Sequence, residues 1–201
     1  MEDVRSVAGM RIIGGVSAGT ILKVPDGLGV RPMPDKVKLA VFNSLGDRVV
    51  GVRVLDLFAG TGALGMECLS RGARELVSVE KSSRHARFYR LNQEAAGVTN
   101  DRIEFRVQDV FPAVHQLAEA GRQFDLIVAD PPYGEKNVGR RSTSLAQKLL
   151  DDAALPRLLA SRGTFVLGHA KRDTLDLAAP WRERKALRHG DTVVRFLEVS
   201  S

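Results

Sequence analysis

The sequence of 201 residues lacks several features that define whole classes of protein. It has one cysteine, Cys68, so an internal disulfide is excluded. We expect Cys68 to serve as a small, buried residue of a helix. No Cys and His residues have the spacing of a metal site, so no metal is expected. No apolar run approaches the roughly 20 residues of a bilayer-spanning helix, which predicts no membrane span.

The start of the chain also lacks the basic and apolar stretches of a secretory signal, so we expect a cytoplasmic protein. What is present is 44% apolar and 27% charged residues, which is typical of a globular chain, and the length favours one main domain. The 30 basic and 24 acidic residues give a net charge of +6. This charge suits nucleic acid, because basic side chains displace counterions from phosphates, but many basic proteins bind no polyanion.

Residues 1–32 are predicted to form an N-terminal extension. Residues 1–9 show no periodicity and are expected to be an irregular lead-in. Residues 11–25 contain two short apolar stretches around a glycine-rich turn, a pattern that predicts a β-hairpin.

A helix is expected to open the second and larger part of the chain, residues 33–201. Pro34 and Asp35 suit the first turn of a helix. The apolar stripe of this helix leaves Lys36 and Lys38 outside it. The stripe consists of Val37, Ala40, Val41 and Leu45.

From residue 52 onward, apolar runs alternate with helical patterns. Strands are predicted at 52–58, 76–80, 103–107, 124–129 and 163–167, and helices at 62–71, 83–96, 111–120 and 145–160. Two last strands, 183–187 and 192–199, are joined by a tight turn and are expected to pair antiparallel. The alternation predicts an α/β fold with a parallel sheet covered on both faces. Seven strands ending in an antiparallel pair are typical of the Rossmann-like sheet of S-adenosylmethionine-dependent methyltransferases.

The first of these strands leads into a glycine-rich loop. Gly60, Gly62 and Gly65 match the pattern G-x-G-x-x-G, in which the backbone can approach an adenosine-containing cofactor closely. The glycines alone do not distinguish NAD from S-adenosylmethionine. Asp56, inside the preceding strand, favours S-adenosylmethionine, because its carboxylate suits the amino group of the methionine moiety and would repel a pyrophosphate. The alternative is an aspartate that only braces the turn.

Two further acids follow the second and third strands. Glu80 is placed where a carboxylate accepts hydrogen bonds from ribose hydroxyls, and the alternative is a strand-end charge paired with Lys81. Asp109 is placed to bind the adenine amino group or to cap the next helix. The predicted cofactor is S-adenosyl-L-methionine. Its predicted contacts are Asp56, Phe58, Ala59, Gly60, Thr61, Gly62, Glu80, Lys81, Asp109 and Val110.

The run Asp130-Pro131-Pro132-Tyr133 follows the fourth strand, at the sheet edge where such folds bind ligands. The prolines fix the backbone and remove two donors, so the loop offers rigidly placed acceptors. A nucleobase amino group is a poor nucleophile, because its lone pair is delocalised into the ring. If the Asp130 carboxylate and the Pro131 carbonyl each accept a hydrogen bond from this amino group, its lone pair turns towards a sulfonium methyl group. Tyr133 would then stack on the base. These four residues are the predicted catalytic residues; the alternative is a stiff turn with a surface tyrosine.

Other polar and aromatic residues give weaker signals. Lys136, Arg140 and Arg141 would form either a basic lip over RNA or a solvated loop. His169, near the end of the fifth strand, is expected to be structural or exposed rather than to line the pocket. Trp181 is expected to pack in the core or at the sheet edge.

Taken together, these motifs resemble the bacterial 16S rRNA (guanine(966)-N(2))-methyltransferase family. The resemblance runs from Met10 to the C-terminal strand. One departure is Met33-Pro34, where the family usually has threonine, whose hydroxyl could cap the helix or reach the cofactor. The matching segments are Met10 to Gly15, Arg31-Pro32, Val37 with Val41 to Leu45, Val54 to Gly65, Leu69 to Ala73, Glu80-Lys81, Phe124 to Ile127 and Asp130 to Tyr133.

The resemblance implies methylation of guanine N2 in 16S rRNA within the small ribosomal subunit or a late assembly intermediate, with the hairpin helping to dock RNA. We expect a monomer. The predicted RNA contacts are Arg11, Arg31, Lys36, Lys136, Arg140 and Arg141. Three alternatives remain: an adenine-N6 methyltransferase, a nucleotide-dependent oxidoreductase, and an assembly factor that binds RNA without chemistry.

Overall fold

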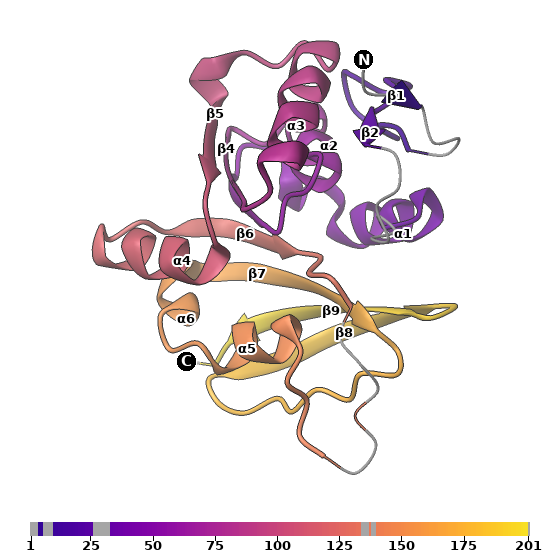
Figure 1. The fold of residues 1–201 in the computed structure, drawn as a ribbon. Helices are drawn as coiled ribbons and strands as arrows, with labels where there is room; N and C mark the ends of the chain where they lie inside the picture. The colour runs from indigo at the N-terminus through magenta and orange to yellow at the C-terminus, as the bar shows by residue number, and fades with distance from the viewer. Residues whose placement is uncertain (1–3, 6–9, 26–32, 134–136, 138–139, 201) are drawn as a thin grey trace.

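The computed structural model describes residues 4–5, 10–25, 33–133, 137 and 140–200. Its main feature is a seven-stranded sheet with the order β5-β4-β3-β6-β7-β9-β8 (Figure 1). Strands β3 to β7 run parallel, and β9 pairs antiparallel with both β7 and β8. The α/β prediction with a terminal antiparallel pair is therefore confirmed. The strands are β3 (Arg53–Leu57), β4 (Glu75–Glu80), β5 (Ile103–Val107), β6 (Phe124–Ala129), β7 (Leu159–Ala170), β8 (Trp181–His189) and β9 (Thr192–Val199).

Helices cover both faces of this sheet (Figure 1). Helices α1, α2 and α3 pack on one face, and α4, α5 and α6 pack on the other. The helices are α1 (Asp35–Leu45), α2 (Ala63–Ser70), α3 (Ser83–Ala95), α4 (Val110–Glu119), α5 (Leu145–Asp151) and α6 (Leu155–Leu158), with short 3-10 turns at Gly46–Val49 and Asn100–Arg102.

The predicted helical region over 145–160 is divided into two helices, α5 and α6, and its last two residues belong to β7. Pro156 has no N–H to donate to the carbonyl of Asp152, so a continuous helix cannot pass this point. The chain instead turns where the Asp152 carboxylate accepts a hydrogen bond from Ala154 N at 2.8 Å. Strand β7 then begins at Leu159, earlier than the predicted 163, because a register shift lets Leu159 pair with Phe124.

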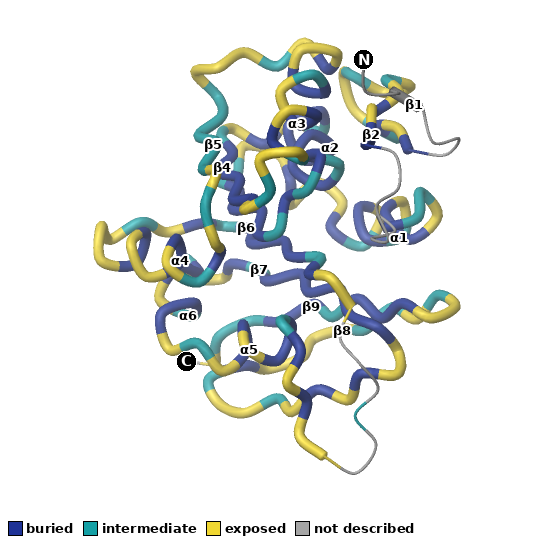
Figure 2. The backbone as a smooth tube through the Cα atoms, in the orientation of Figure 1, coloured by how far each residue is buried: buried dark blue, intermediate teal, exposed yellow. Residues whose placement is uncertain are grey.

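Two apolar cores lie on the two faces of the sheet. Strands β3, β4, β6, β7 and β9 are mostly buried, whereas the edge strands β5 and β8 are not (Figure 2). Cys68 is fully buried in α2, as predicted. Trp181 is buried against Phe165 and donates a hydrogen bond to Leu150 O at 3.0 Å, which confirms its predicted place in the core. No helix within the described part of the chain is long and apolar enough to cross a membrane.

Residues 10–25, which we call the N-terminal segment, fold back on themselves. Ile12 N donates to Thr20 O, and Leu22 N donates to Met10 O, both at 2.9 Å. The hairpin prediction is thus confirmed in outline. The prediction that residues 1–9 form only an irregular lead-in is wrong for Val4 and Arg5, because β1 (Val4–Arg5) pairs antiparallel with β2 (Val24–Pro25). A two-residue strand leaves no periodic pattern in a sequence.

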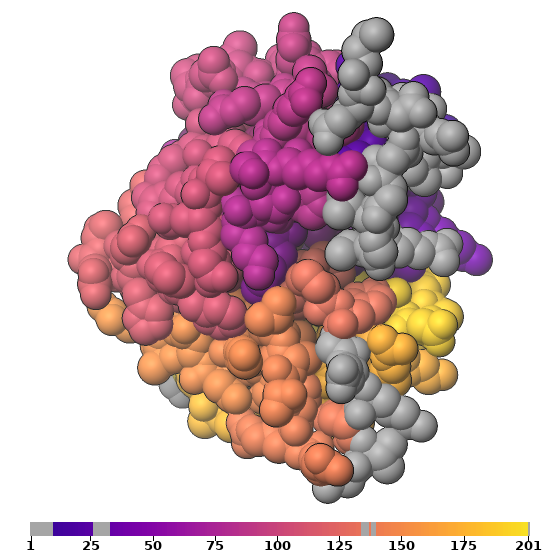
Figure 3. Space-filling model, in the orientation of Figure 1, coloured from indigo at the N-terminus to yellow at the C-terminus, as the bar shows by residue number. Residues whose placement is uncertain are grey.

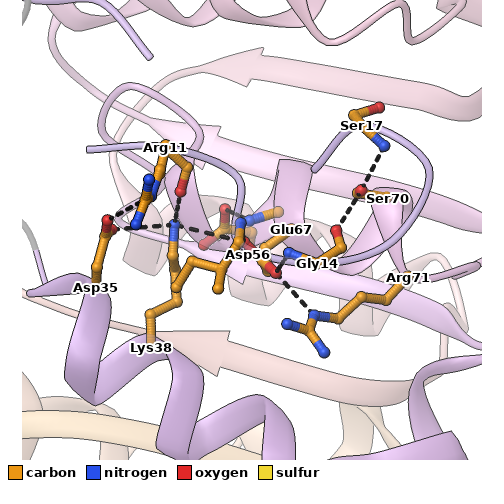
Figure 4. A network of polar contacts seen from close by, with 11 residues as sticks. Arg11, Gly14, Ser17, Asp35, Lys38, Asp56, Glu67, Ser70 and Arg71 are labelled. Atoms are coloured by element: carbon orange, nitrogen blue, oxygen red, sulfur yellow. Dashed lines mark hydrogen bonds and ion pairs between the residues drawn. The ribbon is translucent and has the colours of Figure 1, made fainter. Parts of the chain in front are cut away.

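Helix α2 holds the N-terminal segment through two buried polar side chains (Figure 4). The carboxylate of Glu67, which is fully buried, accepts hydrogen bonds from Ile13 N at 2.7 Å and Gly14 N at 2.9 Å. The hydroxyl of Ser70 donates to Gly14 O at 2.6 Å and accepts from Ser17 N at 2.9 Å. These bonds satisfy backbone groups that the irregular segment cannot pair within itself.

Helix α1 contributes a buried lysine to the same contact (Figure 4). The prediction that Lys38 lies outside the buried stripe is wrong, because only 1% of its surface is exposed. Its ammonium group donates to Arg11 O and lies 3.5 Å from Glu67 and 3.7 Å from Asp35. Burial lowers the pKa of Lys38, and the two carboxylates partly oppose this shift. Lys38 is buried because α1 is covered by the N-terminal segment as well as by the sheet.

Candidate active site at the carboxyl edge of the sheet

The predicted cofactor and catalytic loops leave the same edge of the sheet. Strands β3 and β6 are parallel neighbours, with Leu57 opposite Ala129, so the loops after them start side by side. The strand order also reverses between β3 and β6, which is the place where open α/β sheets bind ligands. In the space-filling view, the magenta residues around α3 meet the orange residues that follow β6 (Figure 3).

Residues 58–62, which we call the glycine loop, have an unusual backbone. Phe58, Gly60 and Gly62 all have positive φ angles, of 59°, 57° and 92°. Such an angle costs a non-glycine residue about 1–2 kcal/mol, so Phe58 is held there by its surroundings. Ala59 N donates to Val79 O at 3.0 Å, which joins the loop to β4. The helix α2 begins directly after the loop, with Gly62 as its N-cap.

Glu80 lies directly beside this loop. Its carboxylate accepts hydrogen bonds from Gly60 N at 2.9 Å and Ser82 N at 2.8 Å, and it lies 3.4 Å from the His85 ring. Burial raises the pKa of Glu80, but His85 and the two amides outweigh burial and lower it below its usual value. The alternative pairing with Lys81, which is exposed, is not observed among the described residues. An ionised acceptor is therefore fixed against the loop.

Asp56 and Asp109 both make the contacts that the sequence offered as their structural alternatives. The fully buried Asp56 accepts a hydrogen bond from Gly65 N at 3.0 Å, which braces the start of α2. A Cβ atom on Gly65 would lie 2.8 Å from this carboxylate, so the approach requires glycine. Asp109 is exposed and caps α4 by accepting from Phe111 N at 3.0 Å. Contacts of Asp56 and Asp109 with a cofactor stay predictions.

The buried Asp56 predicts a pH dependence of stability. Burial raises the pKa of Asp56 from 3.8 to about 8, and the Gly65 bond only partly opposes this. Between these pH values the folded state holds a proton that the unfolded state releases, so the free energy of unfolding falls as the pH rises. We expect Asp56→Asn, which cannot ionise, to gain stability relative to wild type between pH 5 and pH 8, on the order of a few kcal/mol. Urea unfolding of both proteins at each pH measures this gain, and parallel curves would contradict it.

Asp130, directly after β6, has a buried acceptor without a hydrogen-bond partner among the described residues. This acceptor is Oδ1, while the backbone N–H of Met33 donates to the carboxylate. Burial raises the pKa of Asp130 to about 7, and the Met33 bond opposes this shift. A Cβ atom on Gly168 would lie 2.5 Å from Asp130 Oδ1, so a larger residue there would displace the carboxylate.

Sequence reasoning missed both supports of Asp130. Gly168 lies inside β7, and a glycine within a strand is a known sign of a close approach by another group, so this signal was available. The Met33 contact had no signal, because a backbone amide looks the same in every residue but proline. Where the family usually has threonine, Pro34 is the N-cap of α1, and no side chain caps this helix.

The other predicted catalytic residues are Pro131, Pro132 and Tyr133, and a hydrogen bond fixes the Tyr133 side chain. Pro131 is buried and Pro132 is exposed. Tyr133 is 41% exposed, and its hydroxyl shares a hydrogen bond of 2.7 Å with Thr192 at the start of β9. This bond holds the tyrosine at the sheet edge beside Asp130. Thr192 was also missed, because nothing in its local sequence indicates the contact.

The structure describes four of the six predicted RNA contacts. Arg11, Lys36 and Arg140 are exposed, and Arg11 lies 3.6 Å from Asp35. Arg141 is held by Asp151 at 2.6 Å and Asp176 at 3.4 Å. Arg31 and Lys136 lie outside the described residues. A role in RNA binding stays a prediction for all six.

His169 is structural, as expected. It is buried, and its ring accepts a hydrogen bond from Arg195 Nε at 3.0 Å. Burial and the Arg195 charge lower the pKa of His169. Within the described part of the chain, no three His, Cys, Asp or Glu side chains form a cluster that could hold a metal ion.

Known proteins match this chain over part or nearly all of its length. A family model described as conserved hypothetical protein 95 matches residues 10–198. The protein YlbH of Bacillus subtilis, a putative rRNA methyltransferase, is 37% identical over 129 residues, 64% of this chain and 70% of YlbH. The ribosomal RNA small subunit methyltransferase D of Escherichia coli is 36% identical over 62% of this chain, and the match spans 60% of the E. coli protein. The solved structure of a hypothetical protein from Thermus thermophilus is 29% identical and has a TM-score of 0.76, covering 94% of this chain and 99% of that one.

Proposed function

The chain belongs to the family described as conserved hypothetical protein 95, of the ribosomal RNA small subunit methyltransferase D type, and we propose that it methylates N2 of a guanine in 16S ribosomal RNA with S-adenosylmethionine. One observation carries this proposal. The buried Asp130 Oδ1 is an acceptor without a partner among the described residues, next to the glycine loop on the neighbouring strand. A buried acceptor left unpaired is costly, and a substrate N–H would satisfy it.

The chemistry requires an acceptor in this place. The lone pair of a guanine amino group is delocalised into the ring, so the nitrogen attacks poorly until its protons are held out of the way. Asp130 would accept a hydrogen bond from one N–H of the amino group, and the Pro131 carbonyl would accept one from the other. The half-exposed Tyr133 ring, fixed by Thr192, would support the base by stacking. Such a base must first leave its stack to reach the loop.

The residues around the glycine loop fit the proposed cofactor. S-adenosylmethionine supplies an electrophilic methyl group when it is bound. Glu80, ionised and fixed against Gly60, would accept hydrogen bonds from the ribose hydroxyls. Asp56 and Asp109 would lie near the methionine and adenine ends of the cofactor. A nicotinamide cofactor would use the glycines and Glu80 equally well but would leave the acceptor of Asp130 without a role.

The choice of guanine and of the ribosomal substrate rests on likeness. The E. coli relative is named for the small ribosomal subunit, and the N-terminal motifs from Met10 to Leu45 resemble the guanine-N2 family. The net charge of +6 is compatible with an RNA partner. We propose that a single copy acts on 16S rRNA within the small subunit or a late assembly intermediate.

One experiment tests this function. The purified protein is incubated with radiolabelled S-adenosylmethionine and small subunits that lack the modification, and the label is then mapped on the RNA. We expect label at N2 of one guanine of 16S rRNA. Label on adenine N6 would instead support the alternative base specificity, and no transfer to either RNA or DNA would contradict a methyltransferase.

A further inference from the structure

Two buried side chains of α3 support the glycine loop from behind. The Asn92 side chain donates a hydrogen bond from Nδ2 to Thr61 O at 2.9 Å. The ring of Tyr89 lies against Gly62, where a Cβ atom would be only 3.0 Å from a ring carbon. Asn92 and Tyr89 both have 0% of their surface exposed, so these contacts are shielded from water. The conformation of Thr61 and Gly62 therefore depends on how α3 is placed.

Asn92 also binds the N-terminal segment, from the same carboxamide group. Its Oδ1 accepts a hydrogen bond from Lys23 N at 2.7 Å, and its Nδ2 donates to Lys23 O at 2.9 Å. The carboxamide thus pairs with Lys23 as a neighbouring strand would, and it uses its remaining donor on Thr61. All of its hydrogen-bonding groups are occupied, and one side chain joins two segments that lie 38 residues apart in sequence, at positions 23 and 61.

We propose that Asn92 is a positioning residue of the cofactor site that couples the N-terminal segment to the glycine loop. This inference rests on the proposed function, because it takes S-adenosylmethionine as the ligand of the loop. Thr61 lies between Gly60 and Gly62, which both have positive φ and few steric limits. Without a partner for the Thr61 carbonyl, the loop would sample more conformations, and the cofactor would have to order it on binding.

The first test compares neighbouring amides on α3. Asn92→Ala removes the bonds to Thr61 and Lys23. Gln93→Ala is the matched control, because Gln93 is also buried but donates to Val98 O and Asn100 Oδ1, away from the loop. We expect both variants to unfold at lower temperature. In calorimetric titration with S-adenosylmethionine, Asn92→Ala should raise Kd about tenfold, as expected for a lost loop hydrogen bond, whereas Gln93→Ala should leave Kd within about twofold.

The second test asks whether the N-terminal segment acts through Asn92. Ser70→Ala loosens the N-terminal segment at its contact with α2, away from Asn92. Ser70 contacts Gly14 and Ser17 but no described residue of the glycine loop. We expect Ser70→Ala to raise Kd for S-adenosylmethionine in the wild-type background and to have no further effect in Asn92→Ala. Such non-additivity is the mark of two residues that act along one connection.

Two safeguards keep these tests decisive. If Asn92→Ala fails to fold, Asn92→Asp replaces it, because an ionised aspartate still accepts from Lys23 N but can donate to neither Thr61 O nor Lys23 O. Equal Kd values for the Asn92 and Gln93 variants, or an equal effect of Ser70→Ala in both backgrounds, would overturn the proposal. If wild type itself does not bind S-adenosylmethionine, the proposed function fails and this proposal fails with it. The two kinds of failure are therefore distinguishable.

Discussion

Asp130→Asn is expected to reduce methyl transfer about 100- to 1,000-fold, because the substituted amide is a weaker acceptor for the substrate N–H. Asparagine has nearly the same shape, and Gly168 leaves it the same space. The substitution should therefore leave the fold and the affinity for S-adenosylmethionine almost unchanged. The measurement is single-turnover transfer to small subunits, with cofactor binding followed separately by calorimetry.

The pH profile of the wild type gives this prediction a second readout. Burial raises the pKa of Asp130 to about 7, and only the ionised carboxylate is a strong acceptor. We therefore expect kcat/KM to rise with pH up to about 7 and then to level off, and we expect this rise to disappear in the variant.

A carboxylate on the same strand serves as the control. Asp125 lies at the opposite end of β6 and pairs with Arg53 at 3.0 Å, far along the strand from the catalytic loop. Asp125→Asn should lose a little stability, about 1 kcal/mol or less, and should keep full activity. Loss of cofactor binding in Asp130→Asn, or equal activity in both variants, would contradict the assignment of Asp130 to methyl transfer and not to cofactor binding.

Glu67→Ala is expected to lower the free energy of unfolding by about 3–5 kcal/mol, the cost of breaking a buried charge pair from one side. The truncation leaves the ammonium group of Lys38 without its closest carboxylate. It also leaves the partly buried amides of Ile13 and Gly14 without their acceptor. Arg71, which lies 2.7 Å from Glu67, is more exposed and can turn towards water. Denaturant unfolding measures the loss.

Two related variants separate the causes of this loss. Glu67→Gln keeps an acceptor for one backbone amide and removes the charge, so it should lose less stability than Glu67→Ala. The double variant Lys38→Met with Glu67→Ala should be less damaged than the sum of the two single variants, because neither charge is then left alone. Additive losses would mean that Lys38 and Glu67 do not depend on each other.

Much of the fold follows from local patterns. Strands β5, β6 and β9 have the predicted bounds, because alternation and apolar runs of five to eight residues carry their own signal. The order of elements along the chain then limits the sheet to a few arrangements. The misses are equally local in origin. The helix α5 ends at Asp151, and Pro156 lies in the first turn of a separate helix, α6, where apolar periodicity alone would continue one helix. The two-residue strands β1 and β2 are too short to show any period.

The candidate site also contains residues that the sequence indicates and residues that it does not. The glycine loop, Glu80 and Asp130 could be found from the sequence, because a parallel strand places whatever follows it at the carboxyl edge of the sheet. Of their partners, only Gly168 left a signal, as a glycine inside a strand. Met33, Gly168 and Thr192 come from distant parts of the chain, and only packing brings them to the catalytic loop.

The strand–helix alternation determined the class of fold, and the glycine loop with the run Asp130 to Tyr133 determined the type of chemistry that this sequence favours. The missing Cys and His clusters and the absence of long apolar runs excluded other classes of protein. Only the tertiary structure decided which polar groups are buried and with whom. Lys38 shows the reason: helical spacing reports one buried face, but a second segment covers α1, and its contact with Glu67 spans 29 positions, from 38 to 67. Asn92 likewise looks like any polar helix residue until Lys23 and Thr61 are placed against it. Burial and pairing over such distances depend on the whole fold, so no local pattern encodes them.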